Sequence, residues 1–181
     1  MTSIRGLLIS HMIWKNMNHN APHKKHSAAR HRWQDAIFNK DRLPEAYTWS
    51  AETTPGGTAF QRVIRTDTGR TGRVLLYFHG GAYRDGLVPS YRNFSTGFFQ
   101  AANGCETIYL DYRCAPDYQY PTQLNEALDL WDNLTKRQGY APDQIILGGG
   151  SAGANLALAL LLKLRDLNKT MPRAAFCISA W

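Results

Sequence analysis

Long hydrophobic runs are missing from this sequence. The longest apolar run, Leu156 to Leu162, is far shorter than the roughly 20 residues of a bilayer-spanning helix. The apolar stretch from Gly6 to Ile9 is too short for the hydrophobic region of a signal peptide, and no small-residue cleavage site follows it. No transmembrane segment is therefore expected, and a cytoplasmic location is predicted.

Cysteine is scarce, and internal repeats and low-complexity tracts are absent. The three cysteines, Cys105, Cys114 and Cys177, are an odd number, they lack metal-ligand spacing, and they lie in or beside apolar segments. Buried, reduced thiols are the prediction for all three. Neither a metal ion nor any other cofactor is expected.

The positive charge is unevenly distributed. The formal net charge is +7, and residues 1–44 alone contain eight lysines and arginines but only two acids. Such an arm can bind phosphates, but a solvated helical surface is the interpretation that we favour, so no nucleic acid partner is expected. Ala29, Trp33 and Ile37 recur at helical spacing and predict a packing face. We predict a basic helical segment over 1–44 and a core domain over 45–181.

From residue 45 onward, short extended segments alternate with helical ones. Strands are predicted at Tyr47–Ala51, Phe60–Arg65, Arg73–Phe78, Glu106–Asp111, Gln144–Leu147 and Ala174–Ser179. Helices are predicted at Ser90–Ala102, after Pro121 through Leu134, and from Ser151 to about Leu167. The first two strands flank a Pro-Gly-Gly turn and predict a hairpin. The later alternation predicts an α/β fold, a mostly parallel sheet with helices on both faces.

One pentapeptide, Gly149-Gly150-Ser151-Ala152-Gly153, matches the G-x-S-x-G pattern between a predicted strand and a predicted helix. In that setting a strained turn lifts the serine hydroxyl out of the sheet edge, and the flanking glycines let strand and helix pack closely. Ser151 is thus a candidate catalytic nucleophile. Taken alone, the pentapeptide fits equally well a glycine-rich turn that happens to contain serine.

The same region also contains G-x-G-x-x-G, formed by Gly148, Gly150 and Gly153. A dinucleotide site of this type belongs to the first strand of its unit, and an acid ends the next strand. Several strands precede this one, and Ala174–Ser179 contains no acid. A phosphate-binding P-loop is excluded as well, because Ala154-Asn155 occupies the place of Lys-Ser/Thr.

A second glycine-rich element, His79-Gly80-Gly81-Ala82-Tyr83, follows the strand Arg73–Phe78. Acyl transfer creates an oxyanion that preorganised N–H donors must meet, and glycines let the backbone approach closely enough to supply them. Gly80 and Gly81 are the predicted donors from this loop, and Ala152 is the predicted donor beside the nucleophile. His79 is predicted to orient or pack the loop, although a role as a makeshift base stays open.

Three motifs occur in a fixed order, and together they resemble a known family. They are His79-Gly80-Gly81-Ala82, Asp111-Tyr112-Arg113-Cys114-Ala115-Pro116 and Gly150-Ser151-Ala152-Gly153-Ala154-Asn155-Leu156. Most of residues 45–181 resembles the hormone-sensitive-lipase-like esterases of the α/β-hydrolase superfamily. The resemblance implies an α/β-hydrolase fold, a cap segment near the N-terminus, and cofactor-free hydrolysis of short acyl esters or lactones by a Ser–His–Asp triad.

The sequence departs from the family pattern at several motif positions. Ala82 replaces the usual third glycine, Gly150 stands where the family commonly has Asp or Thr, and Ala154 replaces a frequent glycine. The change at Gly150 removes a polar side chain next to the nucleophile. In the middle motif, Asp111 and Arg113 are predicted to form a structural ion pair or hydrogen-bonding set.

Histidine is absent after Ser151, and the only acid there is Asp166. At 1.5 Å per residue, Asp166 lies about 22 Å along the helix from Ser151 and cannot orient a catalytic base. Two interpretations stay open. The chain is either the N-terminal part of a longer esterase, inactive by itself and without its C-terminal strands, or a catalytically dead small-molecule binding protein on the same fold. An unpaired apolar edge at Ala174–Ser179 favours the first.

Overall fold

The computed structural model describes residues 43–68, 70–101 and 104–180. The basic helical segment predicted over residues 1–44 lies almost entirely outside these ranges. Its predicted packing face at Ala29, Trp33 and Ile37 lies wholly outside them. The fold described below is therefore that of the predicted core domain.

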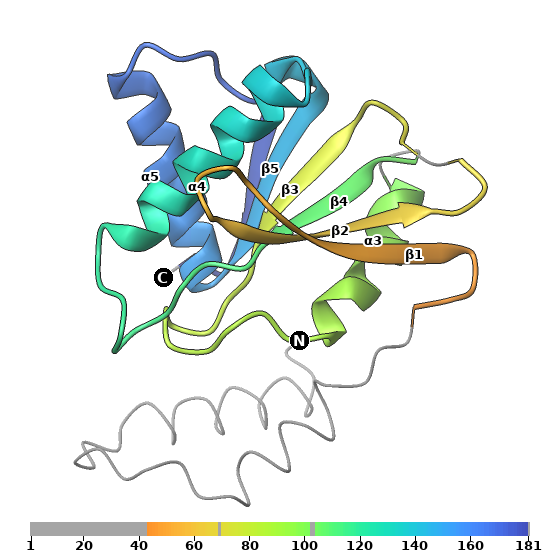
Figure 1. The fold of residues 1–181 in the computed structure, drawn as a ribbon, viewed down its shortest axis with the longest axis horizontal. Helices are drawn as coiled ribbons and strands as arrows, with labels where there is room; N and C mark the ends of the chain where they lie inside the picture. Colours follow the sequence, from red (N-terminus) through yellow and green to blue (C-terminus); the bar gives the residue numbers. More distant parts are fainter. Residues whose placement is uncertain (1–42, 69, 102–103, 181) are drawn as a thin grey trace, which may run out of the picture. The chain divides into compact units, whose positions relative to one another are not determined.

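The core is built on one six-stranded sheet with the strand order β1-β2-β4-β3-β5-β6 (Figure 1). The strands are β1 (Tyr47–Thr53), β2 (Ala59–Arg65), β3 (Val74–Phe78), β4 (Glu106–Leu110), β5 (Ile145–Gly150) and β6 (Ala174–Ile178). Strands β1 and β2 form an antiparallel hairpin, and β2 pairs antiparallel with β4. The other three pairings are parallel. The predicted hairpin and the mostly parallel sheet are both confirmed.

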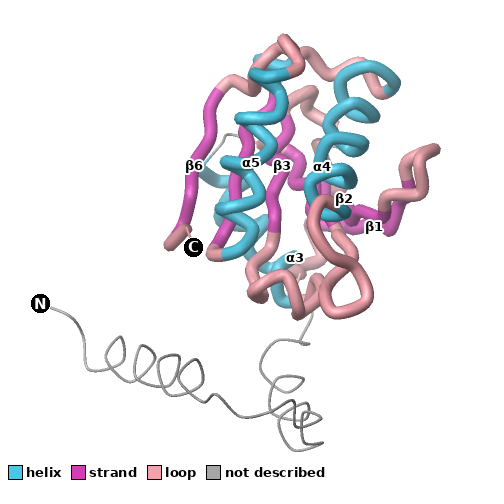
Figure 2. The backbone as a smooth tube through the Cα atoms, turned by 90° about the vertical axis from the view of Figure 1, so that its left-hand side faces the viewer, coloured by secondary structure: helices cyan, strands magenta, loops and turns pink. Residues whose placement is uncertain are grey.

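Helices cover both faces of this sheet. They are α3 (Ser90–Ala101), α4 (Thr122–Asp132) and α5 (Ala152–Asp166), and α4 continues through one π-helical turn at Asn133–Arg137. Figure 2 shows α4 and α5 side by side on one face, whereas α3 lies on the other. The apolar stripe of α4 explains its packing, because Leu124, Ala127 and Trp131 recur on one side of the helix and all are buried.

The core has two parts, one on each face of the sheet, because alternate strand residues point to opposite faces. Leu76 and Phe78 of β3 belong to the larger cluster beneath α4 and α5. Leu75 and Tyr77 of the same strand belong to the smaller cluster against α3. All five residues of β3 are buried, as expected for a central strand of a parallel sheet.

Strand β5 is longer than the sequence predicted. The predicted strand ended at Leu147, but Gly148 and Gly149 continue the pairing with both β3 and β6, and Gly150 continues it with β6. Glycine is needed there because a Cβ on Gly148 would lie only 2.5 Å from the ring of Phe176. The strand therefore runs directly into the candidate nucleophile.

Strand β6 lies at the edge of the sheet, and this position corrects one prediction. Cys105 is buried as predicted, but Cys114 is only partly buried and Cys177 is exposed. Cys177 is exposed because β6 has a neighbouring strand on one side only.

None of the described helices is long and apolar enough to cross a membrane.

A buried ion pair joins β2 to β4. Arg62 Nη1 donates to Glu106, and the two side chains are 3% and 0% exposed. Arg62 Nε also donates to Glu52 at 2.8 Å, and Tyr140 donates its hydroxyl hydrogen to Glu106. Buried charges of this kind need such partners, because an unpaired charge in the interior is costly.

Candidate active site

Ser151 lies at the sharp turn between β5 and α5. Its backbone angles are φ 52° and ψ −119°, a conformation that L-amino acids rarely adopt, and its side chain is exposed. Its N–H donates to the carbonyl oxygen of Ile178 at 2.8 Å, so the end of β6 helps to fix the turn. Strain of this type persists only when the surrounding structure enforces it, and it is concentrated at functional sites.

The glycines on either side of Ser151 are required by close backbone approaches. A Cβ on Gly149 would lie 2.3 Å from the carbonyl oxygen of Gly153, and a Cβ on Gly153 would lie 2.1 Å from that of Phe78. The atoms that each added Cβ would meet belong to the backbone, which cannot move aside as a flexible side chain does. The close packing of strand and helix expected from the pentapeptide is therefore present.

The loop after β3 reaches Ser151, although 71 positions separate Gly80 from Ser151 in the sequence. Strands β3 and β5 are parallel neighbours, so their carboxyl ends meet at the same edge of the sheet. A Cβ on Gly80 would lie 3.4 Å from Cβ of Ser151. Three successive residues of this loop, Gly81, Ala82 and Tyr83, have φ values of 122°, 52° and 58°. The predicted nucleophile and the predicted oxyanion loop are thus brought together.

The N–H groups around Ser151 are not equivalent. The N–H of Gly80 donates to the hydroxyl of Tyr91 at 2.9 Å, so this predicted donor is already engaged. The N–H groups of Gly81 and Ala82 have no acceptor among the described residues. Ala152 is the first residue of α5, and the N–H groups of a first helical turn have no partner within the helix.

His79 is locked into the loop rather than directed at Ser151. Its Nδ1 lies 2.7 Å from the carbonyl oxygen of Gly80, which can only accept, so Nδ1 carries the hydrogen. Its ring stacks on Tyr112 with 4.0 Å between centroids, and the Tyr112 hydroxyl donates to the His79 carbonyl oxygen at 2.8 Å. Burial lowers the pKa of His79 to about 4. The side chain is therefore neutral at physiological pH, as expected of an orienting residue.

Nε2 of His79 is buried and has no hydrogen-bond partner among the described residues. A neutral imidazole with hydrogen on Nδ1 presents a lone pair at Nε2, so this atom can accept a hydrogen bond. Within the described structure no contact joins it to Ser151. The described geometry gives His79 no role as the base that deprotonates Ser151.

Within the middle motif, Arg113 pairs with a different acid from the one predicted. Arg113 forms its ion pair with Glu126 of α4 and not with Asp111, and Glu126 also accepts from the Arg113 N–H at 2.9 Å. Gln123, also on α4, donates to the Arg113 carbonyl oxygen at 2.7 Å. Burial raises the pKa of Asp111. The prediction of an Asp111–Arg113 pair is wrong, because helix α4 supplies the nearer carboxylate.

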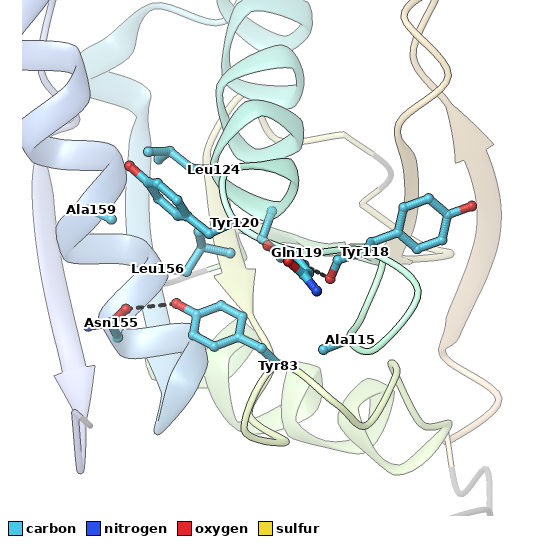
Figure 3. Close-up of a pocket in the computed structure, with 10 residues that line it drawn as sticks. Tyr83, Ala115, Tyr118, Gln119, Tyr120, Leu124, Asn155, Leu156 and Ala159 are labelled. Carbon is cyan, nitrogen blue, oxygen red and sulfur yellow. Dashed lines mark hydrogen bonds between the residues drawn. The ribbon is translucent and has the colours of Figure 1, made fainter.

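A cavity of about 300 Å³ opens beside the N-terminal turns of α5 (Figure 3). Its wall is mostly aromatic and aliphatic, and it includes Tyr83, Ala115, Tyr120, Leu124, Asn155 and Leu156. The Tyr83 hydroxyl donates to Oδ1 of Asn155 at 2.8 Å, which ties the loop after β3 to α5 one turn after Ser151. Sequence reasoning missed this cavity because its wall comes from three stretches that lie far apart in the sequence, at 83, 115–124 and 155–159. Ser151 itself lies outside the lining.

Comparison with known proteins identifies the family. Residues 75–181 match the family model described as alpha/beta hydrolase fold. The chain is an α/β-hydrolase. An acetyl-hydrolase of Streptomyces hygroscopicus is 42% identical over 110 residues, which cover 61% of this chain and 36% of the relative. The carboxylesterase/phospholipase LipF of Mycobacterium tuberculosis is 37% identical over 111 residues, which cover 60% of this chain and 28% of the relative.

Solved structures place this α/β-hydrolase more narrowly. An esterase of the bacterial hormone-sensitive lipase family matches it with a TM-score of 0.79 and 27% identity, over 100% of this chain and 59% of that one. A mutant of the esterase E40 matches with a TM-score of 0.74 and 26% identity, over 100% and 59%. The predicted fold and the resemblance to hormone-sensitive-lipase-like esterases are confirmed. The hydrolase spans 28% to 36% of the length of the two curated relatives named above.

Among the described residues, no group of three or more His, Cys, Asp or Glu side chains is arranged to bind a metal ion. What the structure places beside Ser151 is backbone, the loop that contains Gly80 and the first turn of α5. Backbone N–H groups around a serine suit chemistry in which negative charge develops on a substrate oxygen.

Proposed function

We propose that this α/β-hydrolase is a carboxylic-ester hydrolase for short acyl esters or lactones, with Ser151 as the nucleophile. The observation that carries the proposal is the strained turn at Ser151, packed against the Gly80–Gly81 loop. The names of the relatives support the substrate class. Besides the acetyl-hydrolase, an ethyl acetate hydrolase of Pseudomonas putida is 33% identical over 121 residues.

In the proposed reaction, Oγ of Ser151 attacks the acyl carbon, and negative charge develops on the carbonyl oxygen. The N–H groups of Gly81 and Ala152 are the proposed donors to this oxyanion, and the N–H of Ala82 is the additional candidate that the loop conformation offers. Gly80 joins them only if its hydrogen bond to Tyr91 breaks. The positive end of α5 favours the same charge. Each well-placed donor of this kind is worth about 10²- to 10³-fold in rate.

Hydrolysis also needs a base that accepts the proton of Ser151. The 181 residues contain no histidine after Ser151, and His79 is buried against Tyr112. The described residues therefore supply a nucleophile and N–H donors but no base. We expect the 181-residue chain by itself to hydrolyse esters far more slowly than a complete esterase, because a site without its base retains only about 10³- to 10⁴-fold acceleration over the uncatalysed reaction.

The test is hydrolysis of p-nitrophenyl acetate and butyrate by two proteins. One is the 181-residue chain, and the other is a chimera in which the C-terminal region of the Streptomyces acetyl-hydrolase follows residue 181. Ser151→Ala serves as the matched control in each. We expect the chimera to lose about 10³-fold or more in kcat on Ser151→Ala. Equal rates for the folded chimera and its Ser151→Ala variant would exclude Ser151 as the nucleophile.

A second candidate function is small-molecule binding without turnover. It is favoured by the cavity of about 300 Å³ beside α5, together with the lack of a base among the described residues. A binding protein of this kind would retain affinity for a short acyl compound after Ser151→Ala, because binding needs no nucleophile. Calorimetric titration of both forms with butyrate tests this function: saturable binding of equal affinity by the two forms would support it, and no detectable binding by either would count against it.

A further inference from the structure

A second cavity lies at the edge of the sheet opposite Ser151. In parallel strands all amino ends lie at one edge, and the residues just before β3, β4, β5 and β6 meet there. These are Arg73, Cys105, Gln144 and Arg173, and all four line a cavity of about 360 Å³. Since β3 has five residues, this edge is about 17 Å from the edge that carries Ser151. The cavity is thus separate from the candidate active site.

The two arginines of this cavity are available to a ligand. Arg73 and Arg173 are both exposed, and neither forms an ion pair with any described residue. Arg62, Arg65 and Arg113, in contrast, each pair with a carboxylate. A planar guanidinium matches the geometry of phosphate and carboxylate oxygens and binds them through two parallel hydrogen bonds.

Gln144 adds a donor whose direction is fixed. Its Oε1 accepts the N–H of Ala141 at 2.8 Å, so its amide NH₂ is the end left for another partner. That nitrogen faces Gly72, which has φ 73°, and a Cβ at Gly72 would lie 3.5 Å from it. Thr71 also lines this cavity. The acid in the lining, Asp143, offsets one of the two arginine charges and leaves a net positive site.

We propose that this cavity binds a small organic phosphate, with Arg73 and Arg173 as its main ligands. Hydrogen-bond donors in the lining outnumber acceptors, and this excess favours the binding of an anion. The volume of about 360 Å³ lies at the lower end of the range for small-molecule sites and exceeds the needs of a bare oxyanion. A ligand here joins the starts of β3, β5 and β6, so its binding stabilises the folded sheet.

The first experiment titrates the 181-residue protein with phenyl phosphate and follows the thermal midpoint, with phenol and sodium chloride at equal ionic strength as controls. We expect a saturable rise with phenyl phosphate alone. Arg73→Gln and Arg173→Gln should each weaken binding about tenfold or more, and the double variant should abolish it. The matched control is Arg165→Gln, since Arg165 is exposed on α5 and pairs with Asp166. No saturable rise, or full binding by the double variant, would overturn the proposal.

A second measurement uses cysteines as reporters. Cys105 lines the cavity and is 2% exposed, whereas Cys177 lies on β6, is exposed and does not line it. Phenyl phosphate should slow the alkylation of Cys105, measured by peptide mass mapping, and leave Cys177 unchanged. The protection should disappear in the Arg73→Gln/Arg173→Gln variant. Protection by benzoate equal to that by phenyl phosphate would show a carboxylate site and contradict the proposed phosphate class.

Discussion

Gly150, the residue before the candidate nucleophile, offers a sharp test of how this turn is packed. A Cβ at Gly150 would lie 2.9 Å from the hydroxyl oxygen of Tyr77, closer than real Cβ contacts. Tyr77 is 5% exposed, and its ring is surrounded by those of Tyr91, Phe98, Tyr109 and Phe176, with centroids 5.7 to 6.3 Å away. The hydroxyl therefore has little room to move aside.

From this geometry, Gly150→Ala should lower the free energy of unfolding by about 1–3 kcal/mol, the usual cost of overpacking a well-packed interior. Tyr77→Phe removes the one atom that the new methyl group meets. In the Tyr77→Phe background the same Gly150→Ala change should cost about 0.5 kcal/mol or less. The double-mutant cycle should thus give a coupling of about 1–2 kcal/mol between the two positions.

The assay is urea unfolding followed by circular dichroism for the four members of the cycle. Gly149→Ala is the matched control, because its Cβ would meet the backbone of Gly153, which Tyr77→Phe cannot relieve. An equal cost of Gly150→Ala in both backgrounds would refute the reasoning.

Three further predictions concern other parts of the core. Glu106→Ala removes the fully buried partner of Arg62 and leaves it only the partly exposed Glu52 as an acidic partner, so the change should cost about 3 kcal/mol in urea unfolding. A loss no larger than that of the exposed Asp166→Ala would contradict the role of the Arg62–Glu106 pair. Ala82→Gly should raise the free energy of unfolding by about 0.5–1 kcal/mol because Ala82 has φ 52°, and an unchanged urea midpoint would show that the loop is not strained. Because the pKa of His79 is about 4 in the folded chain and ordinarily 6.5, the unfolded chain binds a proton first as the pH falls. The free energy of unfolding should therefore decrease by about 3 kcal/mol between pH 7 and pH 4 relative to His79→Gln, and parallel pH profiles for the two proteins would argue against a buried neutral His79.

Most of the described elements could be predicted from local sequence. Strands β3 and β4 and helix α4 lie within about one residue of, or inside, the predicted ranges, because a continuous apolar run or a helical stripe expresses their burial directly. Strand β5 was predicted too short, since Gly148 to Gly150 have low strand propensity on their own. Their strand conformation comes from pairing with β6, and for Gly148 and Gly149 also from pairing with β3.

Within the candidate site, the residues themselves were recognisable, but several of their partners were not. Ser151 and its flanking glycines follow from a five-residue pattern, because the turn demands those residue types locally. Arg113 was assigned to Asp111, its near neighbour in sequence, whereas it pairs with Glu126 on the next helix. In the sequence, Glu126 stands out only as an acid on the buried side of α4. Its partner depends on which segment packs against that side of the helix.

The sequence by itself determined the order of elements, the fold class and the position of the strained serine, since each depends on periodicity or backbone geometry over a few residues. Only the tertiary structure decided that the Gly80 N–H binds Tyr91, that Tyr77 lies beside Gly150, and that Arg73 and Arg173 share one cavity. These contacts join segments far apart in the chain. They depend on strand order and on which face of the sheet each side chain occupies, and no local pattern specifies either.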